Sequence, residues 1–173
     1  MPSREKLTPR RVALCGMMVA LAFILSYVEH LIPFNFGIPG VKLGLANLVV
    51  LLALYTLDLR GAFVIAVIRI ILTGLTFGGL FSMLYSLAGG LLSFLLMAFL
   101  SRKKLLGTTG VSICGGIAHN VGQLLVAMCV LETGNVWYYF PVLLISGAVT
   151  GTLIGLVGGL MVGRLQKYLA GRR

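Results

Sequence analysis

The sequence predicts an all-α membrane protein, a bundle of six transmembrane helices that forms a single domain over residues 1–173. Composition and apolar runs support this fold class. Of the 173 residues, 59% are hydrophobic and only 10% are charged, and a soluble domain of this size cannot bury so much apolar surface. The apolar residues also fall into runs of roughly the length that a membrane crossing requires.

The expected spans lie near residues 11–32, 43–57, 61–76, 80–100, 110–131 and 139–163. The first run ends in Glu29-His30 and not in the small residues of a cleavage site, so we interpret it as a span and not as a signal peptide. The second and third runs are short, and we expect them to be irregular or to lie partly within the bundle. The segment TLDLR at 56–60 joins these two as a tight hairpin.

Basic residues indicate the orientation of these spans. The net charge is +10, but the Lys and Arg residues sit in short clusters between apolar runs, so we interpret them as topological signals and lipid contacts and do not expect nucleic-acid binding. With the N-terminus inside, nearly all of the 14 Lys and Arg residues fall in inner segments. We therefore expect a multi-pass protein of the bacterial cytoplasmic membrane with both termini cytoplasmic.

Small residues predict how the helices pack. The last span carries a glycine at every fourth position, namely Gly147, Gly151, Gly155, Gly159 and Gly163. Such a series lets another backbone approach closely, either within the bundle or from a partner subunit. The first span has a shorter small-residue face formed by Gly16 and Ala20 near its cytoplasmic end.

Polar groups inside the apolar runs are the best candidates for a ligand site, because such groups usually face a cavity or a partner. His119, Asn120 and Gln123 are spaced to share a face of the fifth span. This face is explained equally well by hydrogen bonding between helices and by a ligand pocket. The expected ligand-binding residues are Lys42, Asn47, Arg69, Glu29, His30, His119, Asn120 and Gln123.

Two cations stand out among these residues. Lys42 is the basic residue expected on the outer side, where topology gives no reason for it, and Arg69 lies deep in the third span. We expect them to bracket an anionic group of a small polar or anionic ligand. Lys42 could instead be a solvated or lipid-contacting residue, and Arg69 could form an internal ion pair with Glu29.

The sequence predicts no metal site and no bound cofactor. The cysteines Cys15, Cys114 and Cys129 lie in apolar runs without CxxC spacing, and the two histidines lie on different spans. The chain has no GxxxxGK[ST] loop for ATP hydrolysis. Its one aspartate, Asp58, cannot form a cluster of aspartates that would hold magnesium. We therefore do not expect an enzyme.

Several motifs together resemble a known family. The segments GVKLGLANLVVLLALY, YSLAGGLLSFLLM and GGIAHNVGQ, with an arginine in the third span, resemble the Gx transporter family, which is also labelled heptaprenyl diphosphate synthase component I. This family is similar to the substrate-binding S components of energy-coupling-factor (ECF) transporters. The resemblance implies a six-helix S-component fold, a pocket near the outer face, and association with a transmembrane coupling subunit and two ATPases.

The resemblance also bears on the first span. Gly16 and Ala20 match the small-residue face by which S components meet the coupling subunit, although the usual pattern is alanine-rich and this one has Cys15 and Met17 nearby. The resulting expectation is a small-molecule-binding subunit of an ECF-type uptake transporter. The alternatives are a non-transporting membrane partner in flavin, quinone or prenyl-quinone metabolism, or a component of heptaprenyl diphosphate synthesis.

Overall fold

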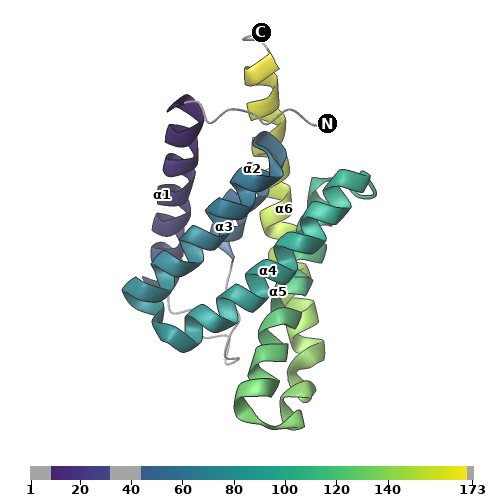
Figure 1. The fold of residues 1–173 in the computed structure, drawn as a ribbon. Helices are drawn as coiled ribbons and strands as arrows, with labels where there is room; N and C mark the ends of the chain where they lie inside the picture. Colours follow the sequence, from purple (N-terminus) through teal and green to yellow (C-terminus); the bar gives the residue numbers. More distant parts are fainter. Residues whose placement is uncertain (1–8, 32–43, 171–173) are drawn as a thin grey trace, which may run out of the picture.

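The computed structural model describes residues 9–31 and 44–170, and within them it contains helices and no strand. The expected all-α fold is therefore confirmed. The helices lie close to the predicted spans, and α6 runs further than predicted (Figure 1). They are α1 (Pro9–Leu31), α2 (Leu45–Thr56), α3 (Leu59–Thr73), α4 (Gly79–Lys103), α5 (Thr108–Leu131) and α6 (Phe140–Ala170), with a π-helical turn η1 (Gly74–Gly78) and a 3-10 turn η2 (Gly134–Tyr139).

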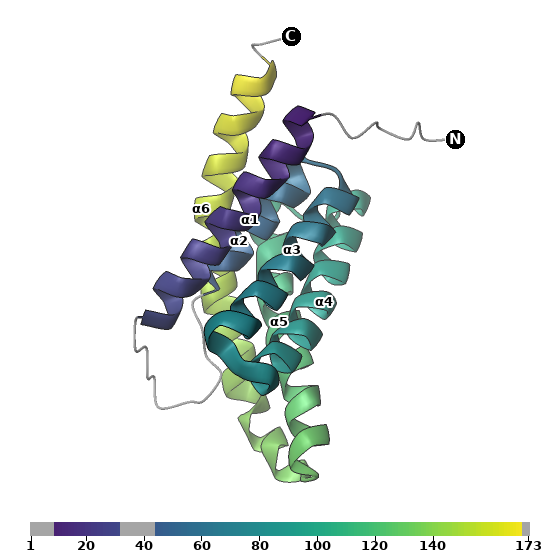
Figure 2. The ribbon, with the colours of Figure 1, turned by 60° about the vertical axis from the view of Figure 1, so that its left-hand side comes forward.

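Four apolar helical stretches of the described chain are long enough to cross a membrane. They are Arg11–Leu31, Leu59–Lys103, Thr108–Leu131 and Gly134–Leu165. The 45-residue stretch reverses direction, because η1 and the left-handed Gly79 (φ 73°) turn α4 back alongside α3 (Figure 2). Helix α2 has 12 residues and is about 18 Å long, which is too short to cross a hydrocarbon core of about 30 Å by itself.

The start of α1, the turn between α2 and α3, and the end of α6 lie at the same end of the bundle (Figures 1 and 2). Basic residues belong to these parts, among them Arg11, Arg60 and Arg164. At this end Arg11 forms an ion pair with Asp58, whose carboxylate also caps α3 by accepting from the backbone N–H of Gly61 at 3.3 Å. Asp58, in the expected hairpin at 56–60, therefore joins α1 to α3.

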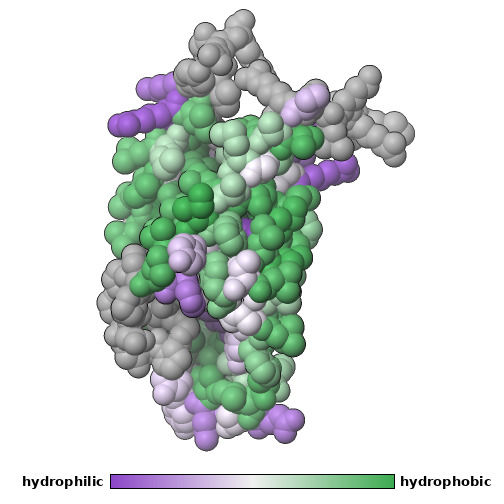
Figure 3. All heavy atoms as spheres, turned by 90° about the vertical axis from the view of Figure 1, so that its left-hand side faces the viewer, coloured by the Kyte–Doolittle hydropathy of each residue, from purple (hydrophilic) through white to green (hydrophobic). Residues whose placement is uncertain are grey.

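Helix α2 lies in the core of the bundle, in contact with α1, α3 and α6. Its Leu51 side chain is fully buried, as are Ile65 of α3 and Val111 of α5, and these three residues belong to the hydrophobic core. Helix α1 lies at the outside, where side chains such as Met17 are exposed. The face shown in Figure 3 is mainly apolar, with hydrophilic side chains at its two ends and a smaller group partway along it. Such a surface is suited to contact with lipid.

Glycines set the distance between α5 and α6. A Cβ atom placed on Gly116 would collide with the carbonyl oxygen of Gly147, and one placed on Gly151 would lie 2.8 Å from the Cα atom of Ile113. Gly155 is equally close to Thr109, whereas a Cβ atom on Gly163 would meet nothing within 4 Å. The first members of the α6 glycine series therefore serve packing within the bundle, one of the two interpretations that the sequence left open.

This packing predicts opposite effects for the same substitution at two glycines of α6. Gly151→Ala should lower the thermal unfolding midpoint of the chain in detergent, because its new methyl group has no room against the α5 backbone. Gly163→Ala should leave the midpoint unchanged or raise it, because alanine is favoured over glycine in a helix by about 1 kcal/mol. A midpoint raised by both substitutions would contradict the close contact between α5 and α6.

Candidate functional site

The guanidinium of Arg69 is a charged group buried inside the bundle. Arg69 lies on α3, about 15 Å along the helix from its start, and the residue is 9% exposed. Its Nη2 donates to Oδ1 of Asn47 on α2 at 2.6 Å, and its buried Nε has no hydrogen-bond partner among the described residues. An arginine side chain has five N–H donors, so this one retains donor capacity for another acceptor.

Glu29 approaches the same region from the last turn of α1. Its Oε1 accepts a hydrogen bond from the backbone N–H of Gly44 at 2.6 Å. Gly44 is the residue that precedes α2, and its φ of 74° is in the left-handed region that favours glycine. Glu29 also lies near enough to attract Arg69, without a direct ion pair between them in the described part of the chain. Glu29, Asn47 and Arg69 thus form one polar group of side chains, and this group links α1, α2 and α3.

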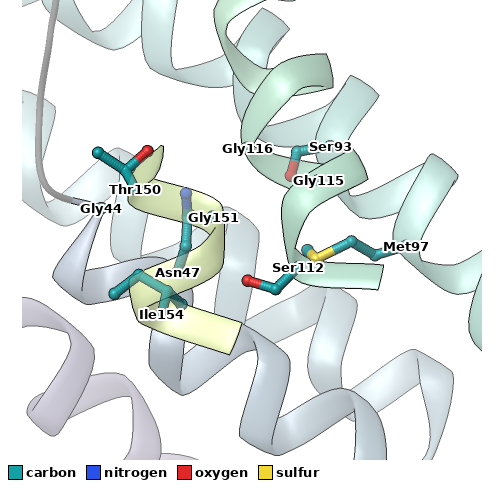
Figure 4. A pocket seen from close by; sticks show the side chains of 10 residues that line it. All are labelled: Gly44, Asn47, Ser93, Met97, Ser112, Gly115, Gly116, Thr150, Gly151 and Ile154. Carbon is teal, nitrogen blue, oxygen red and sulfur yellow. The ribbon is translucent and has the colours of Figure 1, made fainter. Parts of the chain in front are cut away.

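Asn47 also lines a small cavity between α2, α4, α5 and α6 (Figure 4). The lining residues are Gly44, Asn47, Ser93, Met97, Ser112, Gly115, Gly116, Thr150, Gly151 and Ile154. The cavity leaves about 20 Å³ for the centre of a water-sized molecule, which is room for about one ordered water. It is therefore a polar extension of the Arg69 region and too small to hold a larger ligand in this conformation.

Two buried hydroxyls belong to this cavity. Ser93 of α4 is 2% exposed and Ser112 of α5 is 5% exposed, and both line the cavity. Thr150 lines the cavity as well, but its Oγ1 donates to the carbonyl of Ser146 at 2.9 Å. These three hydroxyl residues were not among the predicted ligand-binding residues, because serine and threonine also occur in membrane helices bonded to their own backbone.

The polar residues of α5 do not converge on this cavity. Asn120 faces α6, where its Nδ2 donates to the backbone carbonyl of Leu143 at 2.7 Å. His119 and Gln123 face α4, since a Cβ atom on Gly89 would meet His119 Cε1 at 3.2 Å and Gln123 Cγ at 3.0 Å. The three residues expected on one face are therefore divided between two helix contacts, and Asn120 has the interhelical hydrogen bond that the packing interpretation predicts.

The contacts of His30 are with aromatic rings and not with Arg69. His30 is in ring contact with Phe77 of η1 at a centroid distance of 5.0 Å, and Phe23 and Tyr27 contact the same ring at 5.7 Å. Lys42 lies outside the described residues. Of the expected set, the structure brings together Glu29, Asn47 and Arg69.

The expected partner face on α1 is open in this structure. Gly16 and Ala20 are both exposed, and a Cβ atom placed on Gly16 would meet nothing within 4 Å. The glycine at this position is therefore not required by packing inside the chain. The described residues contain no group of three or more His, Cys, Asp or Glu side chains arranged to hold a metal ion.

Fold and site together define a helical membrane protein with a buried arginine at the contact between α2 and α3. The sequence model of the heptaprenyl diphosphate synthase component I family, the Gx transporter family, matches residues 18–161, which is more than half of the chain. The chain belongs to this family, as its motifs predicted. No curated protein and no solved structure matches it significantly.

The hydrogen bond of Asn120 predicts a stability effect. Asn120→Leu removes the donor to the Leu143 carbonyl, and the free energy of unfolding should fall by about 0.5–2 kcal/mol, the usual range for a hydrogen bond between membrane helices. The measurement is thermal unfolding in detergent, with the exposed Leu125→Ala of the same helix as a control that should have a smaller effect. An Asn120→Leu variant as stable as the wild type would indicate that the residue is not needed for packing of α5 against α6.

Proposed function

We propose that the chain is the membrane-embedded, small-molecule-binding subunit of an ECF-type uptake transporter in the bacterial cytoplasmic membrane. The observation that carries this proposal is the burial of Arg69 beside Asn47, a residue that also lines the polar cavity. A charged side chain in an apolar bundle is unfavourable, and membrane proteins retain such residues mainly where they act on a ligand or an ion. Membership of the Gx transporter family supports the same role.

The position of the site fits uptake from outside. We propose six passes with both termini cytoplasmic, the second made by the short α2 inside the bundle, because the basic end of the bundle holds the start of α1 and the end of α6 (Figure 1). Glu29 lies about 30 Å along α1 from Pro9, close to the opposite end. The polar group formed by Glu29, Asn47 and Arg69 therefore faces the outer half of the membrane in this orientation, where Lys42 is expected at the rim.

The exposed α1 face supports association with a coupling subunit. Small residues on a lipid-exposed helix allow the backbone of a second helix to approach closely. Gly16 and Ala20 lie one helical turn apart on the part of α1 nearer its basic end. In the proposed transporter this face contacts the transmembrane coupling subunit, which in turn binds the ATPases.

The family's description favours a second candidate function. As a component of heptaprenyl diphosphate synthase, the chain would act as a membrane partner in prenyl diphosphate or quinone metabolism. In that role it would be a non-catalytic subunit, since its one aspartate, Asp58, is engaged by Arg11 and by the first turn of α3. The two functions differ in the proteins that bind the chain.

Purification from native membranes tests both functions. We expect the tagged chain, extracted in mild detergent, to retain a transmembrane coupling subunit and ATPases, identified by mass spectrometry of the proteins and of any bound small molecule. Gly16→Leu and Ala20→Leu should reduce the recovery of these partners about tenfold, because the larger side chain prevents close helix contact. Gly163→Leu, another exposed glycine with free space, is the matched control and should retain them.

Two outcomes would contradict this account. Recovery of a soluble prenyl diphosphate synthase in place of ATPases would replace the transport function with the second one. Partner recovery at wild-type yield in both Gly16→Leu and Ala20→Leu would show that the α1 face is not the interface.

A further inference from the structure

Helix α2 begins in the interior of the bundle, and its first turn lies at the polar cavity. Gly44 and Asn47 both line that cavity, and the first turn is closed by a hydrogen bond from the Asn47 N–H to the Gly44 carbonyl at 2.8 Å. The first N–H groups of a helix have no partner within the helix, and they carry a partial positive charge. In membrane transporters, helix starts placed inside the bundle are frequent positions for anionic groups.

Arg69 adds a full positive charge beside this helix start. Its Nη2 is held by Asn47, three residues after Gly44, and its Nε is buried without a partner among the described residues. A planar carboxylate or a phosphate can accept from two N–H groups of one guanidinium at the same time. The unused Nε is therefore an independent indication that the site is built for an acceptor with two oxygens.

An internal carboxylate already lies in this position. Glu29 Oε1 accepts from the Gly44 N–H at 2.6 Å, and its charge attracts Arg69. Only this one hydrogen bond to a described residue holds it, and the side chain is half-buried in the last turn of α1. The Asp58 carboxylate, by contrast, is held by both Arg11 and the Gly61 N–H.

We propose that the start of α2 and the Arg69 guanidinium form an anion-binding site whose internal occupant is the Glu29 carboxylate, and that a carboxylate or phosphate group of the ligand binds there by displacing Glu29. This inference rests on the proposed function for its ligand and names that ligand's chemical class. Glu29 keeps the Arg69 charge balanced while no ligand is bound. A neutral ligand would leave that balance untouched and has no means of displacing the carboxylate.

Competition of this kind lowers the apparent affinity for the anion. A site that is free in about one-tenth of the molecules binds about tenfold more weakly than the same site when it is always free. Replacing Glu29 by glutamine removes the competing charge and leaves a side chain of nearly the same size. The variant should therefore bind a small anion more tightly than the wild-type chain does.

The test uses the purified full-length chain in detergent, with inorganic phosphate as the probe and chloride at equal ionic strength as the reference. The thermal unfolding midpoint is followed as phosphate increases, since an anion that binds the folded state stabilises it. We expect Glu29→Gln to respond at a phosphate concentration about tenfold lower than the wild type does. The response should disappear in the double variant Glu29→Gln/Arg69→Gln. The control variant Glu132→Gln, which changes an exposed acid elsewhere in the chain, should respond like the wild type.

The proposal is overturned if Glu29→Gln and the wild type respond alike, or if the response survives loss of Arg69. If Glu29→Gln does not fold, Glu29→Asp replaces it. The shorter side chain weakens the contact with Gly44, so the response should shift toward lower phosphate, and an unshifted response would overturn the proposal. This result is independent of partner recovery, so the anion site and the transport function can fail separately.

Discussion

The burial of one guanidinium group constrains half of this bundle. Arginine does not lose its proton at physiological pH, so a buried Arg69 needs acceptors and a compensating charge from its surroundings. Asn47 provides the acceptor from α2, and Glu29 provides the charge from α1. Because these residues come from three helices, the depth and rotation of α1, α2 and α3 are linked by these polar interactions. The short α2 can lie inside the bundle for the same reason, since the N–H of Gly44, the residue just before the helix, donates to the Glu29 carboxylate.

The other half of the bundle is held by a different kind of contact. Helices α4, α5 and α6 approach one another through glycines, as at Gly89, Gly116 and Gly151, where any side chain would collide with the neighbouring backbone. Van der Waals contact between backbones is the main attraction available to helices in lipid. The cavity lies between the two halves, with Asn47 on one side and glycine-rich α5 and α6 on the other (Figure 4).

The sequence predicted the helices well, because long apolar runs and the glycine series depend on local composition alone. It also selected Arg69, Glu29 and Asn47, which the structure brings together, because charged and amide groups are rare in apolar runs. It did not place the polar face of α5, because His119 and Asn120 point to different neighbouring helices that helical spacing does not reveal. It did not predict the hydroxyls of Ser93 and Ser112 at the cavity or the hydrogen bond between Glu29 and Gly44. Both features depend on how segments far apart in the sequence pack together.

The central claim is that Glu29 balances the charge of the buried Arg69. A double-mutant cycle of Arg69→Gln and Glu29→Gln, read by the unfolding free energy in phosphate-free detergent solution, tests it most directly. Each single substitution should destabilise the chain, because it leaves one charge without its counterpart. The double variant should lose less stability than the sum of the two single losses, with a coupling of about 0.5–3 kcal/mol. Losses that add without coupling would show that the two charges do not interact and would contradict the account.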